Sequence, residues 1–214
     1  MERQRIQYDL LQSRDVESAI RVLATSFSTA EPPAVAMGLS LTELADFVRL
    51  LMPRAVAEQL TVVARSAAQD GIIGVMLCDD FVAPPEFDRR QISQRFLPIF
   101  AMLESLDDQY RSGRAMRHGE YLHLFMLAVD AHFSGHGIAQ GLVKNCLENG
   151  MQKGYRCAVT EATGMISQRV FRKLGFEERF RVSYRDYRYG GEAVFTSITD
   201  HGGAALMDRC MAQL

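Results

Sequence analysis

Two closely spaced glycines, Gly135 and Gly137, follow an apolar run at residues 121–129 and introduce an amphipathic run at residues 137–153. This order predicts a strand, a tight turn and a helix, because glycine adopts turn conformations that other residues avoid. The first N–H groups of a helix have no partner within it, and they carry the positive end of the helix dipole. Such a turn can hold a phosphate group, so the sequence indicates a phosphorylated ligand.

Two common phosphate-binding motifs do not fit this turn. A Walker loop needs a lysine directly after its last glycine, and Lys144 lies too far along the chain. A dinucleotide fingerprint needs Gly-x-Gly-x-x-Gly, whereas Gly135, Gly137 and Gly141 are spaced one residue too widely. Glu161 lies at roughly the distance that this fingerprint expects for its acidic residue, but the glycine spacing excludes the motif. The alternative is an ordinary strand-to-helix turn whose glycines allow tight packing.

Composition favours one globular domain spanning residues 1–214. The chain is 48% hydrophobic and has a formal net charge of −2, with basic residues spread along its length, so we expect no nucleic-acid partner. No run reaches the roughly 18 apolar residues that cross a membrane. The polar N-terminus does not resemble a signal peptide, so a cytoplasmic protein without membrane association is expected.

The four cysteines are not spaced as metal ligands, so no metal site is expected. Cys78 and Cys157 fall in predicted strands, and Cys146 falls in a predicted helix, while Cys210 lies near the C-terminus. This distribution indicates buried, reduced thiols, as is usual for a cytosolic protein.

Hydrophobic periodicity predicts an alternation of strands and helices. Strands are predicted at residues 5–11, 60–67, 71–81, 121–129, 155–161, 180–187 and 192–198. Helices are predicted at residues 15–27, 41–51 with a continuation past Pro53 to 59, 91–110, 137–153 and 167–174, with a short one from 203. Turn residues predict hairpins at 69–71 and 190–191. Central strand–helix–strand units imply parallel pairing and the hairpins imply antiparallel pairing, so an α/β fold with helices on both faces of a mixed sheet is expected.

Two segments resemble the signatures of the GNAT fold of acyl-CoA-dependent N-acyltransferases. The first is the turn Ser134-Gly-His-Gly-Ile-Ala139, and the second is the helix end Val170-Phe-Arg-Lys-Leu-Gly-Phe176. The family usually has Arg or Gln where this turn has Ser134. The resemblance implies a mixed, mostly antiparallel central sheet of about seven strands with helices on both faces.

A narrower resemblance is to the insect-type arylalkylamine N-acyltransferases, also called dopamine N-acetyltransferases. It rests on residues 167–176, 180–187 and 191–195, and on Phe27-Ser-Thr-Ala-Glu-Pro-Pro33, which is similar to that family's Phe-x-x-Asp-Glu-Pro-Leu. The likeness is strong from about residue 121 to residue 198 and patchy before that.

This resemblance implies an N-acetyltransferase that uses acetyl-CoA as co-substrate and acetylates a small primary amine by direct attack in a ternary complex. The CoA-binding core would span about residues 121–176, and the acceptor side about residues 1–120. The strand edge would bind the pantetheine arm and the turn amides the pyrophosphate. The implied cofactor-binding residues are Leu127, Ala128, Val129, Ser134, Gly135, His136, Gly137, Ile138, Ala139, Ser167 and Phe171.

The resemblance assigns the general base to Glu31, the glutamate of the Glu-Pro pair. The alternative is that Glu31 only begins a loop before two prolines. His123 is a rival base, because it matches one of two strand histidines in the vertebrate arylalkylamine enzymes. The second of that pair falls on Phe125, and a lone histidine on an apolar strand also suits a core residue.

Hydroxyl groups near the second signature are candidates for the general acid. Many GNAT enzymes have a tyrosine where this chain has Phe171, which has no proton to give. The insect-type enzymes use hydroxyls earlier in that helix, and Ser167 and Thr163 match those positions. If the helix began at Thr163, both hydroxyls would share one face; alternatively Thr163 caps the helix and Ser167 packs.

The same residues also allow functions other than acetylation of an arylalkylamine. A GNAT enzyme could acetylate a polyamine, an aminoglycoside or a protein lysine, and a polyamine pocket should be rich in carboxylates. The acidic candidates are Asp79, Asp80, Glu86, Asp88, Asp107 and Asp108. A non-catalytic acyl-CoA sensor is a further alternative, and either a monomer or a homodimer fits. Side chains considered for the phosphates are His132, His136, Lys144 and Arg172.

Overall fold

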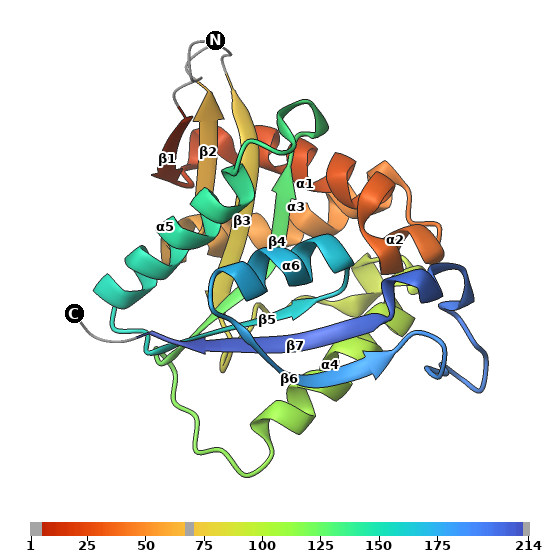
Figure 1. Ribbon diagram of the computed structural model, residues 1–214. Helices are drawn as coiled ribbons and strands as arrows, with labels where there is room; N and C mark the ends of the chain where they lie inside the picture. The colour runs from red at the N-terminus through yellow and green to blue at the C-terminus, as the bar shows by residue number, and fades with distance from the viewer. Residues whose placement is uncertain (1–5, 67–70, 212–214) are drawn as a thin grey trace.

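The structure is a computed structural model that describes residues 6–66 and 71–211 (Figure 1). Within these residues, the strands are β1 (Ile6–Leu10), β2 (Val62–Ser66), β3 (Ile72–Asp80), β4 (Tyr121–Val129), β5 (Cys157–Ala162), β6 (Glu177–Ser183) and β7 (Gly203–Cys210). The α-helices are α1 (Val16–Ala30), α2 (Pro32–Ala36), α3 (Leu41–Glu58), α4 (Leu97–Arg111), α5 (Ile138–Gln152) and α6 (Met165–Lys173).

The strands form one mixed sheet in the order β1-β2-β3-β4-β5-β7-β6. All neighbouring strands are antiparallel except β4 and β5, which run parallel and are in register only from Tyr121 to His123 of β4. Beyond His123, β4 stays paired with β3 while β5 stays paired with β7. The two strands therefore diverge and leave one edge of β4 open in the middle of the sheet (Figure 1).

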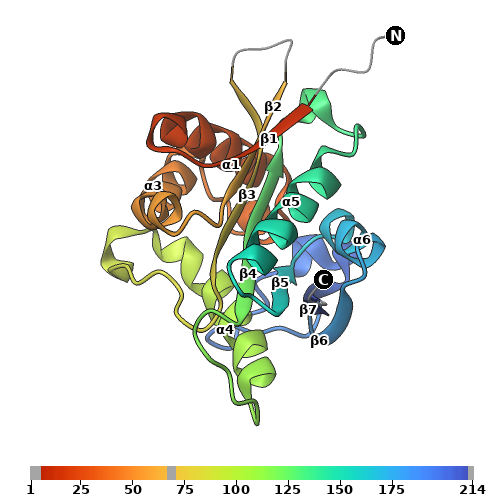
Figure 2. The same ribbon diagram turned by 90° about the vertical axis from the view of Figure 1, so that its left-hand side faces the viewer.

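Helices cover both faces of the sheet (Figure 2). One hydrophobic core lies under α1, α3 and α4, and the other lies under α5 and α6. Strand β3 is buried at every position, so neighbours such as Val75 and Met76 contribute to opposite cores. A strand covered on both faces is apolar throughout, which explains why this segment does not alternate. The predicted α/β class and the helices on both faces are confirmed.

Two predictions for the C-terminal segment were wrong. Residues 192–198 form no strand, and a 3-10 helix, η5 (Thr196–His201), occupies the end of this stretch. Residues from Gly203 onward form β7, which lies between β5 and β6, and not a short helix. Alanine, leucine and methionine favour helices locally, but burial on both faces of the sheet overrides this weak propensity.

The two predicted hairpins have different outcomes. The strands β2 and β3 pair antiparallel as expected, while Gln69 and Asp70 of the predicted turn lie outside the described residues. Gly190 and Gly191 do reverse the chain, but only one isolated bridge spans them, from Tyr189 to Glu192.

The helix α3 continues through Pro53 to Glu58, as the sequence predicted. It begins at a capping box in which Ser40 accepts from the N–H of Glu43, while the Glu43 carboxylate accepts from Ser40. None of the helices in the described part of the chain combines the length and the apolar character that a membrane crossing requires.

The prediction of burial, which rested on Cys78, Cys146 and Cys157, holds for Cys78 and Cys146. Cys157 is partly exposed, and Cys210 is exposed. Cys157 and Cys210 lie directly opposite each other on β5 and β7, with their Sγ atoms 3.3 Å apart. The sequence did not reveal this pairing, because it depends on the unpredicted strand β7.

Candidate active site

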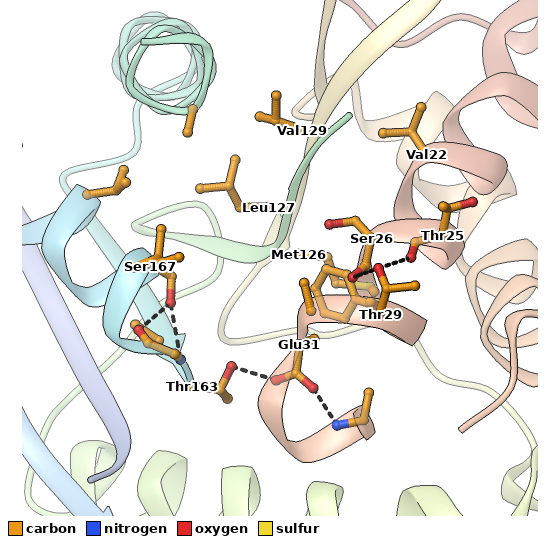
Figure 3. Close-up of a pocket in the computed structure, with 18 of the residues that line it drawn as sticks. Val22, Thr25, Ser26, Thr29, Glu31, Met126, Leu127, Val129, Thr163 and Ser167 are labelled. Carbon is orange, nitrogen blue, oxygen red and sulfur yellow. Dashed lines mark hydrogen bonds between the residues drawn. The ribbon is translucent and has the colours of Figure 1, made fainter. Parts of the chain in front are cut away.

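A cleft of about 1140 Å³ lies between α1 and α2 on one side and α5 and α6 on the other. The open edge of β4 crosses its centre, with Leu127 and Val129 between Thr25 of α1 and Ser167 of α6 (Figure 3). The diverging strands β4 and β5 therefore position the cleft. It continues past α2 into an aromatic region formed by α3 and α4.

Leu127 and Val129 line the cleft, whereas Ala128 between them is 2% exposed and is not among the cleft-lining residues. Successive side chains of a strand point to opposite faces, so the side chain of Ala128 points away from the cleft and only its main chain lies on the open edge of β4. Beyond Leu124, whose carbonyl accepts from Thr160 Oγ1 at 2.8 Å, no described strand pairs with this edge. Its free N–H and C=O groups suit the amide groups of a pantetheine arm.

The turn after β4 has the backbone that its glycines predict. Gly135 and Gly137 have φ angles of 80° and 78°, a left-handed conformation that side chains disfavour. The first paired amide of α5 is that of Gly141, which donates to the Gly137 carbonyl, so the amides of Ile138 and Ala139 precede the helical bonds. These amides suit a pyrophosphate group.

Most of the residues assigned to this turn do line the cleft. They are Ser134, Gly135, Gly137, Ile138 and Ala139, and His132 lines it too. His136 is exposed and does not line the cleft, because its ring is turned toward the carbonyls of Phe133 and Ser134.

Glu31 connects α1 to α2 and lines the cleft. Its Oε2 accepts from the Ala34 N–H at 2.6 Å, and its Oε1 accepts from Thr163 Oγ1 at 2.6 Å (Figure 3). Glu31 is thus the N-cap of α2, and Pro32 and Pro33 begin that helix, where proline is favoured, and do not begin a loop.

Burial raises the pKa of Glu31 to about 7, although the hydrogen bonds from Thr163 and Ala34 oppose the rise. A carboxyl group that titrates near neutrality can both take up and release a proton at physiological pH. Loss of hydration is therefore the main cause of the raised pKa of Glu31, as it is for buried carboxyl groups in general.

Thr163 and Ser167 lie at the start of α6 and both line the cleft. The helix begins at Met165, so Thr163 lies before it and the two hydroxyls do not share a helical face. Thr163 donates to Glu31, while Ser167 Oγ donates to the Gly164 carbonyl at 2.9 Å. Phe171 also lines the cleft and is 2% exposed.

His123 lies outside the cleft, between two carboxylates. Its Nδ1 is 2.9 Å from Asp79 and its Nε2 is 2.8 Å from Glu161. Burial alone would lower the pKa of His123, but the two carboxylates outweigh it and raise the pKa well above the usual value. Both ring nitrogens are occupied, so the structure does not bring this rival base to the cleft and places it instead in a buried ion network.

A third carboxyl group completes this network. Burial, followed by repulsion from Glu161, raises the pKa of Asp107 to about 9, so Asp107 is protonated at neutral pH. Asp107 Oδ1 and Glu161 Oε1 are buried without a donor among the described residues, and a proton on Asp107 allows a hydrogen bond between the two carboxyl groups. Sequence reasoning missed this network, although charged residues within the apolar runs of β3, β4 and β5 were a signal.

The far half of the cleft is lined by four phenylalanines, which sequence reasoning also missed. Phe47 of α3 lies 4.9 Å from Phe96, 5.5 Å from Phe100 and 6.4 Å from Phe125 between ring centroids. The four residues come from distant parts of the chain, and only the spacing of Phe96 and Phe100 was visible in the sequence as a helical pair. This aromatic wall suits a planar apolar group.

Part of the chain matches a known protein family. Residues 100–176, which include the turn and the Leu-Gly-Phe segment, match the model of the Acetyltransferase (GNAT) family. The C-terminal condensation domain of Ebony, in complex with beta-alanyl-dopamine, superposes with a TM-score of 0.89 at 19% identity. The alignment covers 97% of this chain and 100% of that chain.

Two N-acetyltransferases share the same architecture. Arylalkylamine N-acetyltransferase 2 from Aedes aegypti has a TM-score of 0.77 at 22% identity, covering 97% of this chain and 99% of that chain. The Drosophila melanogaster polyamine N-acetyltransferase has a TM-score of 0.74 at 18% identity, covering 97% and 100%. At these identities the structures establish the fold, and the family model covers its central part. Residues 100–176 therefore match the GNAT acetyltransferase family, and the mostly antiparallel sheet expected of the GNAT fold is confirmed.

Proposed function

We propose that this protein is an acetyl-CoA-dependent N-acetyltransferase whose acceptor is a small primary amine bearing an aromatic ring. Glu31 carries the proposal, because a carboxyl group with a pKa of about 7 lies in the same cleft as the open edge of β4 and the aromatic wall. A base at that place can take the proton of an amine that approaches from the aromatic side.

The residues of the cleft divide the reaction between them. When bound, acetyl-CoA supplies a thioester whose acetyl group passes to the amine nitrogen while the sulfur leaves as a thiol. Glu31 takes the proton that the amine loses, and Thr163 holds the carboxylate in place through Oγ1. We assign protonation of the sulfur to Ser167, because its hydroxyl donates only to the neutral Gly164 carbonyl, whereas the Thr163 hydroxyl is held by the Glu31 carboxylate and Phe171 has no proton to give.

The turn and the β4 edge give the cofactor half of this proposal its physical basis. The left-handed glycines allow backbone amides to face a pyrophosphate, and the β4 edge from residue 125 to 129, which is paired with β3 on its other side only, can bind amide groups in the manner of a strand. In addition, the cleft volume of about 1140 Å³ is large enough for a cofactor and a small acceptor together.

An aromatic amine fits the acceptor half better than a polyamine. None of the acidic residues considered for a polyamine lines the cleft; they are Asp79, Asp80, Glu86, Asp88, Asp107 and Asp108. Glu161 does line it, but its charge is balanced by His123 at 2.8 Å. The Aedes aegypti arylalkylamine N-acetyltransferase and the Ebony domain with its beta-alanyl-dopamine add support for an arylalkylamine.

We also propose that residues 1–214 work as one domain. The cofactor side lies on β4, α5 and α6, and the acceptor side is formed by α1, α2 and α3 together with α4. Neither part would enclose the cleft without the other, so the acceptor-side residues 1–120 and the CoA-binding core from about 121 to 176 belong to one catalytic unit.

The test measures free-thiol release from acetyl-CoA with tyramine, dopamine, serotonin, spermidine, an aminoglycoside and a lysine peptide. Release with the arylalkylamines alone is expected. Beta-alanyl-CoA serves as a second donor, because the Ebony domain is in complex with beta-alanyl-dopamine. Release with spermidine alone would contradict the aromatic acceptor. Binding of acetyl-CoA without thiol release for any amine would favour a sensor over an enzyme.

A further inference from the structure

Three arginine and lysine side chains line the cleft: Arg21 on α1, and Arg169 and Lys173 on α6. All three are exposed, and none makes a hydrogen bond or an ion pair with another described residue. By contrast, Arg172 on the same helix is held by Glu178 at 3.0 Å and does not line the cleft. A cation without a protein partner at the wall of a cleft is available for an anionic ligand.

The turn itself lacks such a charge. Residues 134–141 contain no lysine or arginine, and Ser134 occupies the position that resembled an Arg or Gln site. Backbone amides at a helix start provide only partial positive charge. Lys144, a cation suggested by the sequence, is exposed on α5 and does not line the cleft.

Arg169 and Lys173 are four residues apart, so they project from one face of α6. Ile166 and Val170, on the adjacent row of that face, line the cleft with them, and α6 packs against α5, which follows the turn. We propose that Arg169 and Lys173 bind phosphate groups of coenzyme A and replace the basic side chain that the turn lacks. The inference rests on the proposed function, since it names the side chains that recognise the same cofactor.

Phosphate recognition by these two cations predicts a selective effect. Replacing both with alanine should raise the KM for acetyl-CoA at least about tenfold, because two charge-assisted hydrogen bonds are lost. Acetyl-pantetheine has the same thioester and no phosphate, so its kcat/KM should be the same for the double variant and the wild type. The wild-type affinity for CoA should weaken as salt increases, and that of the double variant should respond less.

The matched control is Lys144→Ala, which removes an exposed cation from α5, outside the cleft. Calorimetry of CoA binding to wild type, Lys144→Ala and the Arg169→Ala/Lys173→Ala double variant needs no amine substrate. If the wild type binds no CoA, the proposed function fails. If the wild type binds CoA and the double variant binds it equally well, this inference is overturned while the proposed function stands. If CoA affinity fell only in an Arg21→Ala variant, the inference would also be overturned, because the phosphate groups would then be bound from α1 and not from α6.

Cys157 and Cys210 lie opposite each other at the ends of β5 and β7. The Met211 N–H donates to the Arg156 carbonyl at 2.7 Å, which makes the next pair, Cys157 and Cys210, a non-hydrogen-bonded pair. In such a pair the Cα atoms are closest, at about 4.5 Å, within the range that a disulfide spans. The Sγ atoms are already 3.3 Å apart.

We propose that Cys157 and Cys210 form a reversible disulfide when the protein meets a small disulfide such as oxidised glutathione. Exposed Cys210 attacks first, releasing one glutathione as its thiol and leaving a mixed disulfide on the protein. Cys157 then attacks the Cys210 sulfur and releases the second glutathione. Burial raises the pKa of Cys157 to about 12, which makes Cys210 the initiating thiol.

Mass spectrometry after treatment with oxidised glutathione tests this step on the whole protein. The wild type should lose the mass of two hydrogens, and a peptide map should join Cys157 to Cys210. The Cys210→Ser variant should lose none, whereas Cys78→Ser, which removes a buried thiol, should behave as the wild type does. A lasting glutathione adduct or a disulfide-linked dimer in place of the internal bond would overturn the proposal.

Discussion

The substitution Glu31→Gln tests the assignment of the base most directly. With a pKa of about 7, the fraction of ionised Glu31 falls about tenfold for each pH unit below that value. Thiol release measured as kcat/KM should therefore decline below pH 7 in the wild type. Ionisation of the amine substrate also changes kcat/KM with pH, but equally for the wild type and for Glu31→Gln. Dividing the wild-type pH profile by that of the variant therefore leaves the contribution of Glu31. The variant should be slower by about 10²–10⁴ at high pH, the usual contribution of a general base.

The raised pKa of Glu31 should also make the stability of the protein depend on pH, which can be measured without substrate. Its pKa is about 7 in the folded protein against an ordinary value of 4.5 for a glutamate, so the folded state holds the proton more tightly. The free energy of unfolding is therefore highest below the lower value and falls as pH rises through this window. The difference between the two pKa values corresponds to about 3 kcal/mol. Thermal melts should show Glu31→Gln gaining stability relative to the wild type between pH 5 and pH 8.

Glu43→Gln is the matched control, since Glu43 also caps a helix and does not line the cleft. Its pKa is lowered to about 2, chiefly by a hydrogen bond from Ser93, so it stays ionised across the assay range. This variant should keep the wild-type pH profile. If Glu31→Gln also kept the wild-type rate and profile at every pH, the reasoning about the base would be refuted.

Three further substitutions test neighbouring features. Thr163→Val removes a hydrogen bond that lowers the pKa of Glu31, so the acidic limb of the kcat/KM profile should move to higher pH; an unmoved limb contradicts this. Gly137→Ala places a side chain at a φ of 78°, which should cost about 1–2 kcal/mol in thermal melts and weaken CoA binding. Asp107 holds its proton up to about pH 9 when folded, so wild-type stability falls as pH rises from about 4 to 9. Asp107→Asn should lack the part of this fall that Asp107 contributes and melt higher than the wild type at pH 9, and equal melts would count against a protonated Asp107.

Local sequence signals predicted the parts of the site that one short segment builds. The turn at Gly135 and Gly137 and the helix ending at Gly175 depend on glycine conformations within a few residues, and both were confirmed. The position of Glu31 beside Thr163 is different, because the two residues are far apart in the chain. The family resemblance assigned both residues to one active site, but nothing in the sequence indicated that they would be in contact.

Long-range register explains what sequence reasoning missed. Asp79, His123 and Glu161 meet because β3, β4 and β5 align them across the sheet, and each alone resembles an isolated polar residue in an apolar run. The strand β7 was missed for a related reason. Its alanine, leucine and methionine residues become a central strand only through pairing with β5 and β6.

The N-cap of α2 and the proposed base are one carboxyl group. Glu31 accepts the Ala34 amide at 2.6 Å while it is ionised, and a protonated carboxyl group is a weaker acceptor. Each proton taken from an amine would therefore weaken the cap of a five-residue helix by a fraction of the ~1 kcal/mol that such caps contribute. Pro32 and Ala34 of that helix line the cleft. Bond formation would thus loosen the wall past which the amide product leaves, and loss of the proton to solvent would tighten it for the next substrate.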